Sequence, residues 1–103
     1  MRTFANVTVE LEGNSYFDGA VTSRTVNFPD GSRKTLGFML PGEYEFGTAA
    51  AELMEITSGE LDVKLPGNSE WMTVKGGGVF NVPADSSFQV RVKTVTDYCC
   101  SYL

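Results

Sequence analysis

The sequence predicts an all-β protein with a single domain, built as a sandwich or a barrel. Helical periodicity is almost absent along the 103 residues, and only residues 49–53 could form a helical turn, which is too short to stand alone. Instead, roughly nine or ten short β-rich runs, often with apolar residues at every second position, are separated by Gly, Pro, Asn or Asp. Turn signals about every 8–12 residues are typical of β-sandwiches and barrels.

The expected strands follow one another with short connections. In chain order the runs cover residues 7–11, 21–28, 34–40, 43–48, 53–56, 61–65, 71–74, 79–82, 88–92 and 98–103. Pro29-Asp30-Gly31-Ser32 and Pro41-Gly42 are turn sequences, because proline presets φ and glycine tolerates positive φ. Pro66-Gly67-Asn68-Ser69 favours a hairpin loop. No linker or repeat interrupts the chain, so we expect one domain over residues 14–103, preceded by an arm or edge strand at residues 1–13.

The charge and the composition exclude several classes of partner. The formal charge is −5 at pH 7, from 13 acidic and 8 basic residues. Nucleic-acid backbones and anionic membranes attract clustered Lys and Arg, so neither is expected as a partner. No apolar run approaches the roughly 18 residues of a membrane span, and the first residues lack the apolar core of a signal peptide. The cytoplasm is therefore the expected location.

The two cysteines, Cys99 and Cys100, are adjacent in the last run. Neighbouring residues of a strand point to opposite faces, so the two thiols are poorly placed to form a disulfide with each other. We expect one of them to be buried as a small apolar residue and the other to lie near the surface. A zinc site with two cysteines needs further ligands, and the chain offers none at a suitable spacing.

Two stretches of the chain resemble the two halves of the cupin signature. The first runs from Pro41-Gly42-Glu43 to Glu52 and closes at Ser58-Gly59-Glu60-Leu61, and the second covers residues 77–88. In cupins these stretches place histidines and a glutamate on a metal inside a double-stranded β-helix, a small barrel of jelly-roll type. This chain contains no histidine. The resemblance therefore implies a cupin-like β-barrel without the usual metal, and no cofactor is expected.

The chain is still more similar to the pyrimidine/purine nucleoside phosphorylase family of small single-domain cupins. The matching stretches are Asn14-Ser15-Tyr16-Phe17, Gly42-Glu43-Tyr44-Glu45-Phe46, Thr48-Ala49, Met54 with Ser58-Gly59, residues 79–83, Tyr98, Cys100 and Tyr102-Leu103. They extend from residue 14 to the end and leave residues 1–13 outside. The resemblance implies a homodimeric pentosyltransferase that cleaves purine and pyrimidine nucleosides with phosphate to the free base and ribose 1-phosphate.

Phosphorolysis places three demands on such a site. A cation or a cluster of backbone N–H groups should hold the phosphate. A carboxylate or dipole should lie near the positive charge that develops on the sugar, and a flat apolar surface should stack the base. Without histidine, proton transfer falls to Glu, Asp or Tyr, so water or Tyr98 would assist the departing base.

Strand parity, the rule that alternate residues of a strand point to the same face, and the cupin pattern together select Glu52 as the catalytic candidate. Tyr44, Phe46 and Thr48 share one face of their strand. The cupin resemblance implies that this face points inward, because Thr48 and Ala50 stand at the positions of the two metal histidines. Phe88 stands at the position of the last histidine. Glu52 stands at the position of the metal-binding glutamate. A buried carboxylate must be paired or hydrogen-bonded, which suits Glu52 to bind sugar hydroxyls or to stabilise the oxocarbenium ion. The alternative is an exposed carboxylate on a loop.

Arg33 is the best candidate for binding phosphate, because it begins a strand just after a turn and can reach the mouth of a barrel. The alternative is a solvated charge at a strand end. Substrate binding is also expected from Thr48 and from an aromatic wall. The candidates for that wall are Tyr44, Phe46, Phe80, Phe88 and Tyr98. Aromatic residues at alternate positions more often belong to a core, so we expect about two of the five to touch the ligand.

Two other classes of function stay open at this point. A non-catalytic cupin that binds a sugar or nucleotide would use the same pocket and would show ligand binding without turnover. A metal-dependent dioxygenase or isomerase needs a ligand set such as two histidines and a carboxylate. That set cannot be assembled from a chain without histidine.

Overall fold

The computed structural model describes all 103 residues and contains eleven β-strands and no helix. The strands are β1 (Thr8–Val9), β2 (Asn14–Tyr16), β3 (Val21–Asn27), β4 (Arg33–Met39), β5 (Gly42–Thr48), β6 (Glu52–Ser58), β7 (Glu60–Lys64), β8 (Met72–Lys75), β9 (Val79–Val82), β10 (Ser86–Val92) and β11 (Thr96–Tyr102). The predicted all-β class is confirmed. Residues 49–53 form no helical turn, because the chain bends there and enters β6.

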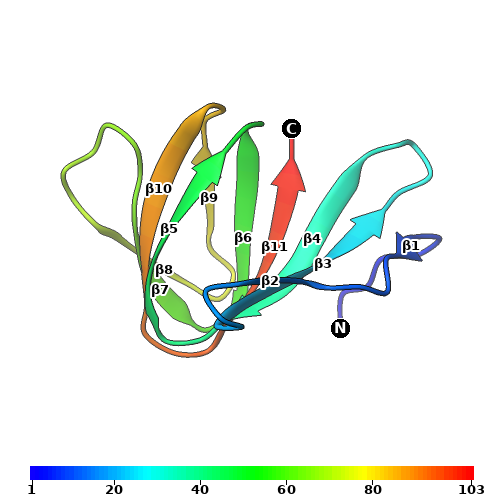
Figure 1. The fold of residues 1–103 in the computed structure, drawn as a ribbon, viewed down its shortest axis with the longest axis horizontal. Coiled ribbons are helices and arrows are strands. Elements are labelled where there is room, and N and C mark those ends of the chain that lie inside the picture. Colours follow the sequence, from blue (N-terminus) through cyan, green and yellow to red (C-terminus); the bar gives the residue numbers. More distant parts are fainter.

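The strands form two antiparallel sheets that face each other (Figure 1). The larger sheet has the order β1-β3-β4-β11-β6-β9, with β2 paired to β3, and the smaller sheet has the order β5-β10-β7-β8. No strand of one sheet pairs with a strand of the other. The expected barrel is therefore a β-sandwich that backbone hydrogen bonds do not close.

Ten of the strands coincide with runs expected from the sequence, with ends that differ by at most two residues. The strand that the sequence did not predict is β2. Asn14 and Ser15 are typical turn residues, yet they pair with Ser23 and Thr22 of β3. The amide of Asn14 also donates a hydrogen bond to the hydroxyl of Ser23 over 3.2 Å. Pairing with a long neighbouring strand outweighs the local turn preference here.

The core lies between the two sheets and follows the period-two pattern of the strands. Its members alternate with exposed residues along β5, β9 and β10. Ile56 of β6 and Leu61 and Val63 of β7 have no exposed surface at all. Because each sheet contributes one apolar face, the side chains that reach the space between the sheets are set by parity alone.

Both cysteines are buried, which corrects the expectation that one of them lies near the surface. Cys99 is 5% exposed and Cys100 is 3% exposed. They do point to opposite sides of β11 as neighbours on a strand must. Cys100 faces the space between the sheets, whereas Cys99 lies on the outer face between Leu36 of β4 and Glu55 of β6. A short side chain in the middle of a sheet is shielded by the longer side chains beside it.

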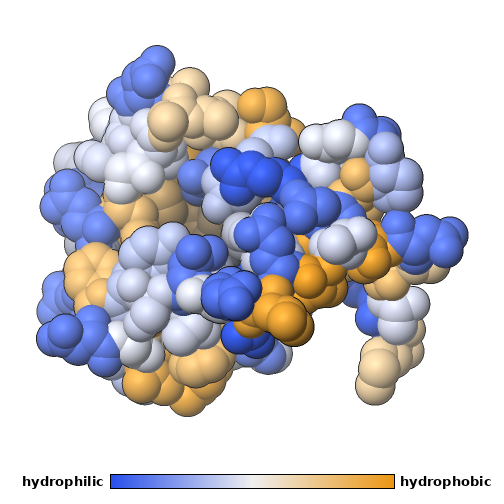
Figure 2. Space-filling model, turned by 45° about the vertical axis from the view of Figure 1, so that its right-hand side comes forward, coloured by the Kyte–Doolittle hydropathy of each residue, from blue (hydrophilic) through white to orange (hydrophobic).

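The amino-terminal segment runs along the outside of the larger sheet. β1 pairs with the end of β3, the Arg2 guanidinium lies 2.7 Å from the Glu55 carboxylate, and the ring of Phe4 packs edge-on against Phe28 at 5.1 Å between centroids. Figure 2 shows a segment projecting from the right-hand side of the molecule, next to a strip of apolar side chains. The structure includes no helix that is long and apolar enough to cross a membrane.

Candidate functional site

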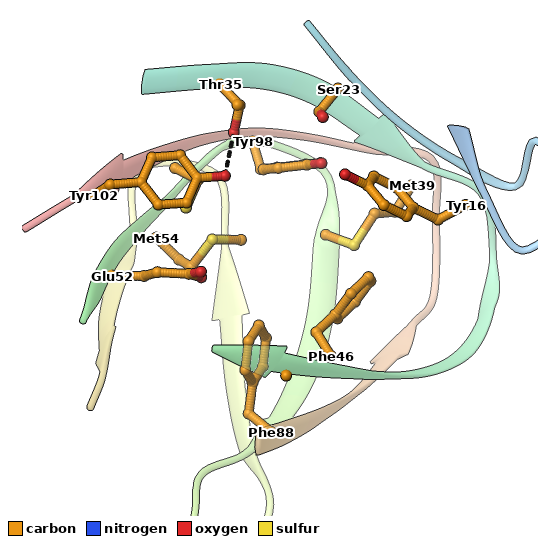
Figure 3. A pocket seen from close by; sticks show the side chains of 12 residues that line it. Tyr16, Ser23, Thr35, Met39, Phe46, Glu52, Met54, Phe88, Tyr98 and Tyr102 are labelled. Carbon is orange, nitrogen blue, oxygen red and sulfur yellow. Dashed lines mark hydrogen bonds between the residues drawn. The ribbon is translucent and has the colours of Figure 1, made fainter. Parts of the chain in front are cut away.

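A cavity with a volume of about 160 Å³ opens between the two sheets. Figure 3 shows most of its lining side chains. The lining residues are Tyr16, Ser23, Thr35, Met39, Phe46, Gly47, Glu52, Met54, Phe88, Tyr98, Cys100 and Tyr102. The larger sheet supplies nine of them and the smaller sheet supplies Phe46, Gly47 and Phe88. The cavity is therefore mostly apolar with a few hydroxyls and one carboxylate, the composition typical of small-molecule sites.

β11 and β6 place the polar end of the cavity. Glu52 lies directly opposite Tyr102 in the register of these strands, and Met54 lies opposite Cys100. All four side chains point to the same side of the sheet, because the register pairs residues of equal parity. Figure 3 shows Glu52, Met54 and Tyr102 together at one end of the cavity.

Glu52 is a half-buried carboxylate with a raised pKa. Burial is the main cause, because it penalises the charged form, and a hydrogen bond from Cys100 and the positive charge of Arg33 act in the opposite direction. In return, burial and the charge of Glu52 raise the pKa of the Cys100 thiol to about 12. The thiol therefore stays protonated near neutral pH and can donate its proton to the carboxylate.

Arg33 lies at the rim of this polar end. Its guanidinium carbon is 4.0 Å from the centre of the Tyr102 ring, a cation–π arrangement. The hydroxyls of Tyr102 and Thr35 are 3.4 Å apart, and burial raises the pKa of Tyr102. Arg33 is itself solvent-exposed, so its charge borders the cavity without lying inside it.

Tyr98 crosses the cavity wall to reach a strand that is not its neighbour. Its hydroxyl donates a hydrogen bond to the backbone carbonyl of Thr22 on β3, over 3.0 Å. Gly37 of β4 lies between them, and a Cβ built there would collide with the Thr22 carbonyl. Burial raises the pKa of Tyr98 far above its usual range. A phenol that is already hydrogen-bonded and holds its proton this firmly is a poor acid at neutral pH.

Four of the seven residues expected to form the site line the cavity, namely Glu52, Phe46, Phe88 and Tyr98. The other three lie beside it. Arg33 is at the rim. Tyr44 lies outside the lining, where its hydroxyl donates a hydrogen bond to the Leu40 carbonyl over 2.7 Å.

Thr48, the third residue beside the cavity, is buried with its hydroxyl fully used by the backbone. The hydroxyl donates to the Pro83 carbonyl over 2.7 Å and accepts from the Ser86 amide over 3.1 Å. These bonds join the end of β5 to the connection between β9 and β10. Phe80, the remaining aromatic candidate, packs in the core against Phe88 with centroids 6.0 Å apart.

Comparison with known proteins places the chain in a family. A family model described as pyrimidine/purine nucleoside phosphorylase matches residues 11–102. The chain belongs to the pyrimidine/purine nucleoside phosphorylase family. A curated protein of that name from Sulfurovum sp. (strain NBC37-1) is 86% identical over the whole of both chains. This likeness includes residues 1–13, which the sequence motifs had left outside the resemblance.

Solved structures support the fold of this nucleoside phosphorylase family member. The crystal structure of a protein of unknown function from Acinetobacter sp. superposes with a TM-score of 0.95 at 41% identity, covering 98% of each chain. A cupin superfamily protein from Desulfitobacterium hafniense superposes with a TM-score of 0.68 at 18% identity, covering 90% of this chain and 83% of that one. The predicted cupin fold is confirmed, in the form of an open sandwich.

Sequence reasoning missed several residues that line the cavity. They are Tyr16, Ser23, Thr35, Met39, Gly47, Met54, Cys100 and Tyr102. Most carry a signal in the period-two pattern: Cys100 and Tyr102 share the parity of Tyr98, and Thr35 and Met39 share that of Arg33. Tyr16 carries no such signal, because it lies outside the β-rich runs expected from the sequence.

The side chains at the cupin metal positions do not fit a metal ion. Nowhere in the structure do three or more His, Cys, Asp or Glu side chains cluster closely enough to hold one. The Thr48 hydroxyl is hydrogen-bonded to the backbone, and the Phe88 side chain has no atom that could bind a metal. Glu52 and the protonated Cys100 thiol are the remaining candidates, and two ligands are fewer than a protein metal site needs.

Proposed function

We propose that this family member is a nucleoside phosphorylase, a pentosyltransferase that acts on purine and pyrimidine nucleosides without a metal cofactor. The observation that carries the proposal is a cavity that joins one half-buried carboxylate to an aromatic wall, in a chain of this family. The products are the free base and ribose 1-phosphate. The name of the Sulfurovum relative supports the same reaction.

Arg33 is proposed to bind the phosphate at the rim of the cavity. Its position against the Tyr102 ring, 4.0 Å from the centroid, holds the guanidinium beside the polar end. A planar guanidinium can donate two parallel hydrogen bonds to phosphate oxygens. The positive charge of Arg33 also acts on Glu52, so phosphate at this place would lie near the carboxylate that faces the sugar.

Glu52 is proposed to bind the ribose and to stabilise the positive charge on the anomeric carbon in the transition state. Only the ionised carboxylate offers that stabilisation. The pKa of Glu52 is raised, so activity should fall on the acid side at a higher pH than an ordinary glutamate would give. Phe46, Phe88 and Tyr98 are proposed to contact the base, with an apolar surface that does not demand one particular base.

The proton balance of the reaction needs no catalytic histidine. A phosphate oxygen forms a bond to the anomeric carbon while the bond from that carbon to the base nitrogen breaks. The attacking monohydrogen phosphate loses one proton, and the departing base gains one. Because Tyr98 is hydrogen-bonded to Thr22 and its pKa is raised, we propose water as the carrier of this proton.

The proposed activity is tested by incubating the purified protein with uridine or adenosine and phosphate, and measuring the released base. We expect release that depends on phosphate and persists after treatment with a metal chelator. Glu52→Gln should lower kcat/KM by about 100-fold or more, the loss typical of removing one transition-state charge contact. Glu45→Gln is the matched control, because Glu45 lies on the exposed face of β5.

Three outcomes would contradict the proposal. If the unchanged protein released no more base than the Glu52→Gln variant, Glu52 would have no role in the reaction. Thermal stabilisation by nucleosides without any turnover would favour a non-catalytic binding protein instead. A stoichiometric transition metal in the active protein would overturn the metal-independent scheme.

A further inference from the structure

The cavity has two chemically different ends. Glu52, Tyr102 and the rim residue Arg33 form the polar end. Tyr16 and Phe46 form the other end, which Figure 3 shows on the opposite side of the cavity from Glu52. Along β11, the lining residues Tyr98 and Tyr102 lie four residues apart, which is about 13 Å of strand. A nucleoside is long enough to reach from one end toward the other.

Tyr16 is the least enclosed aromatic residue of the cavity wall. It is 47% exposed, whereas Phe88 is 4% exposed and Tyr98 is 8% exposed. Its strand, β2, pairs with β3 alone. The cavity volume of about 160 Å³ is below the roughly 300–1,000 Å³ typical of ligand sites. Tyr16 is the most exposed aromatic side chain of the wall, so its ring can shift to admit a larger ligand with the smallest loss of packing.

The turn after Tyr16 holds its ring over the cavity. Phe17 and Asp18 have left-handed φ values of 54° and 55°, an uncommon conformation for two successive residues other than glycine. The ring of Phe17 packs against Tyr44 at 5.0 Å and against Phe46 at 5.6 Å between centroids. Tyr44 therefore supports the turn that carries Tyr16, although it does not line the cavity itself.

The hydroxyl of Tyr16 is available to a ligand. The hydroxyls of Tyr98, Thr35 and Tyr102 are hydrogen-bonded within the protein, whereas Tyr16 makes no hydrogen bond through its hydroxyl. Figure 3 shows this hydroxyl at the cavity wall, pointing toward the hydroxyl of Tyr98. Because no hydrogen bond anchors the Tyr16 ring, its face can turn toward a ligand, whereas the Tyr98 ring is fixed by its bond to Thr22.

We propose that the nucleoside base stacks on Tyr16, and that the nucleoside lies lengthwise with its base at this end and its ribose at the Glu52 end. The proposal rests on the nucleoside substrate proposed above and adds the residue that holds the base and the direction in which the substrate enters. Stacking on an aromatic ring is tolerant of base identity. Tyr16 thereby accounts for a site that accepts both purines and pyrimidines.

The test compares Tyr16→Ala, Tyr16→Phe and Arg33→Gln with the unchanged protein. Two quantities are measured: the Kd of uridine and adenosine without phosphate, by calorimetry, and the separate KM values of nucleoside and phosphate. Tyr16→Ala should raise the nucleoside Kd and KM by roughly 10-fold or more and leave the phosphate KM within about 2-fold. Tyr16→Phe keeps the ring and should stay within about 3-fold. Arg33→Gln should instead raise the phosphate KM and leave the nucleoside Kd and KM nearly unchanged.

A control and the contrary outcomes make the test decisive. Leu11→Ala removes an exposed apolar side chain outside the cavity and should change neither constant. An unchanged nucleoside Kd in Tyr16→Ala, with an unchanged melting temperature, would overturn the stacking role, and a raised phosphate KM alone would reverse the orientation. Tyr16-dependent nucleoside binding without turnover would contradict the phosphorylase but support the stacking role. Absence of both binding and turnover would overturn both.

Discussion

Glu52 is the residue at which the stability and the proposed function of the protein conflict. Burial raises its pKa above the usual 4.5, so the folded state holds a proton there more tightly than the unfolded state does. The stabilising effect of that proton is present in full below pH 4.5 and is lost as the pH rises through the folded-state pKa. Above its folded-state pKa, Glu52 is a charged carboxylate at a place where an uncharged group would be more stable.

Replacing Glu52 with Gln should raise the melting temperature at pH 7, because the amide carries no charge to desolvate. Glu52 is only half-buried, so we expect a gain below about 1 kcal/mol, which corresponds to at most about 4–8 °C for a domain of this size. The gain should vanish near pH 4, where the carboxyl is protonated. Thermal melts from pH 4 to pH 8 measure it. Glu45→Gln should show no such trend, and a gain that grows toward low pH would contradict the assignment.

At the scale of the elements, β4 contains the glycine that allows Tyr98 of the aromatic wall to reach β3. Gly37 faces inward on β4, between Tyr98 of β11 and the Thr22 carbonyl of β3. The missing side chain lets the Tyr98 ring cross β4 and reach that carbonyl. A strand glycine is normally a weakness, and here the space it leaves is occupied by the backbone carbonyl of Thr22.

Gly37→Ala should therefore destabilise the fold strongly. The added Cβ would collide with the Thr22 carbonyl oxygen, which belongs to the backbone and cannot rotate away. We expect a loss of about 2 kcal/mol or more, measured by urea unfolding. Gly47→Ala is the matched control, because its added Cβ would meet only the Ser86 carbonyl at 3.9 Å. Equal unfolding free energies for the two variants would show that the strands can separate to make room.

At the scale of the whole molecule, the outer face of the larger sheet carries exposed apolar side chains. Leu36 and Phe38 of β4 are 40% and 37% exposed, and Val9 of β1 is 50% exposed. The three line one shallow depression. Adjacent exposed apolar residues often mark an interface. We propose that this face joins two copies of the chain, in keeping with the homodimer that the family resemblance implies.

Sedimentation should therefore give about twice the chain mass of 11.2 kDa. Phe38→Asp places a charge in the middle of the proposed interface and should shift the protein to the monomer. Met72→Asp is the control, because Met72 is 44% exposed on β8 of the other sheet. A monomeric unchanged protein, or a dimer that survives Phe38→Asp, would contradict this interface.

The fold was largely predictable because its signal is local. Alternation along each run reports which face is buried, and Gly and Pro mark the turns. β2 escaped prediction because Asn14 and Ser15 pair with β3 against their own turn preference. The burial of Cys99 also escaped, because it depends on the longer side chains of the two neighbouring strands.

The candidate site was predictable only in part. Parity placed Phe46 and Phe88 on the inward face, and the family resemblance directed attention to Glu52 and Tyr98; all four line the cavity. Parity does not state how far along the sandwich a side chain lies. Tyr44 and Thr48 share the parity of Phe46, yet the hydroxyl of each is bonded to the backbone outside the cavity.

The sequence by itself determined the all-β class, the strand positions, the inward faces and the family. These features follow from period-two patterns, turn residues and motifs that are read along the chain. Only the tertiary structure decided that Arg33 borders the carboxylate of Glu52 and that Tyr16 covers the far end of the cavity. Those contacts join residues distant in sequence, and they depend on the register and packing of strands that no local pattern records.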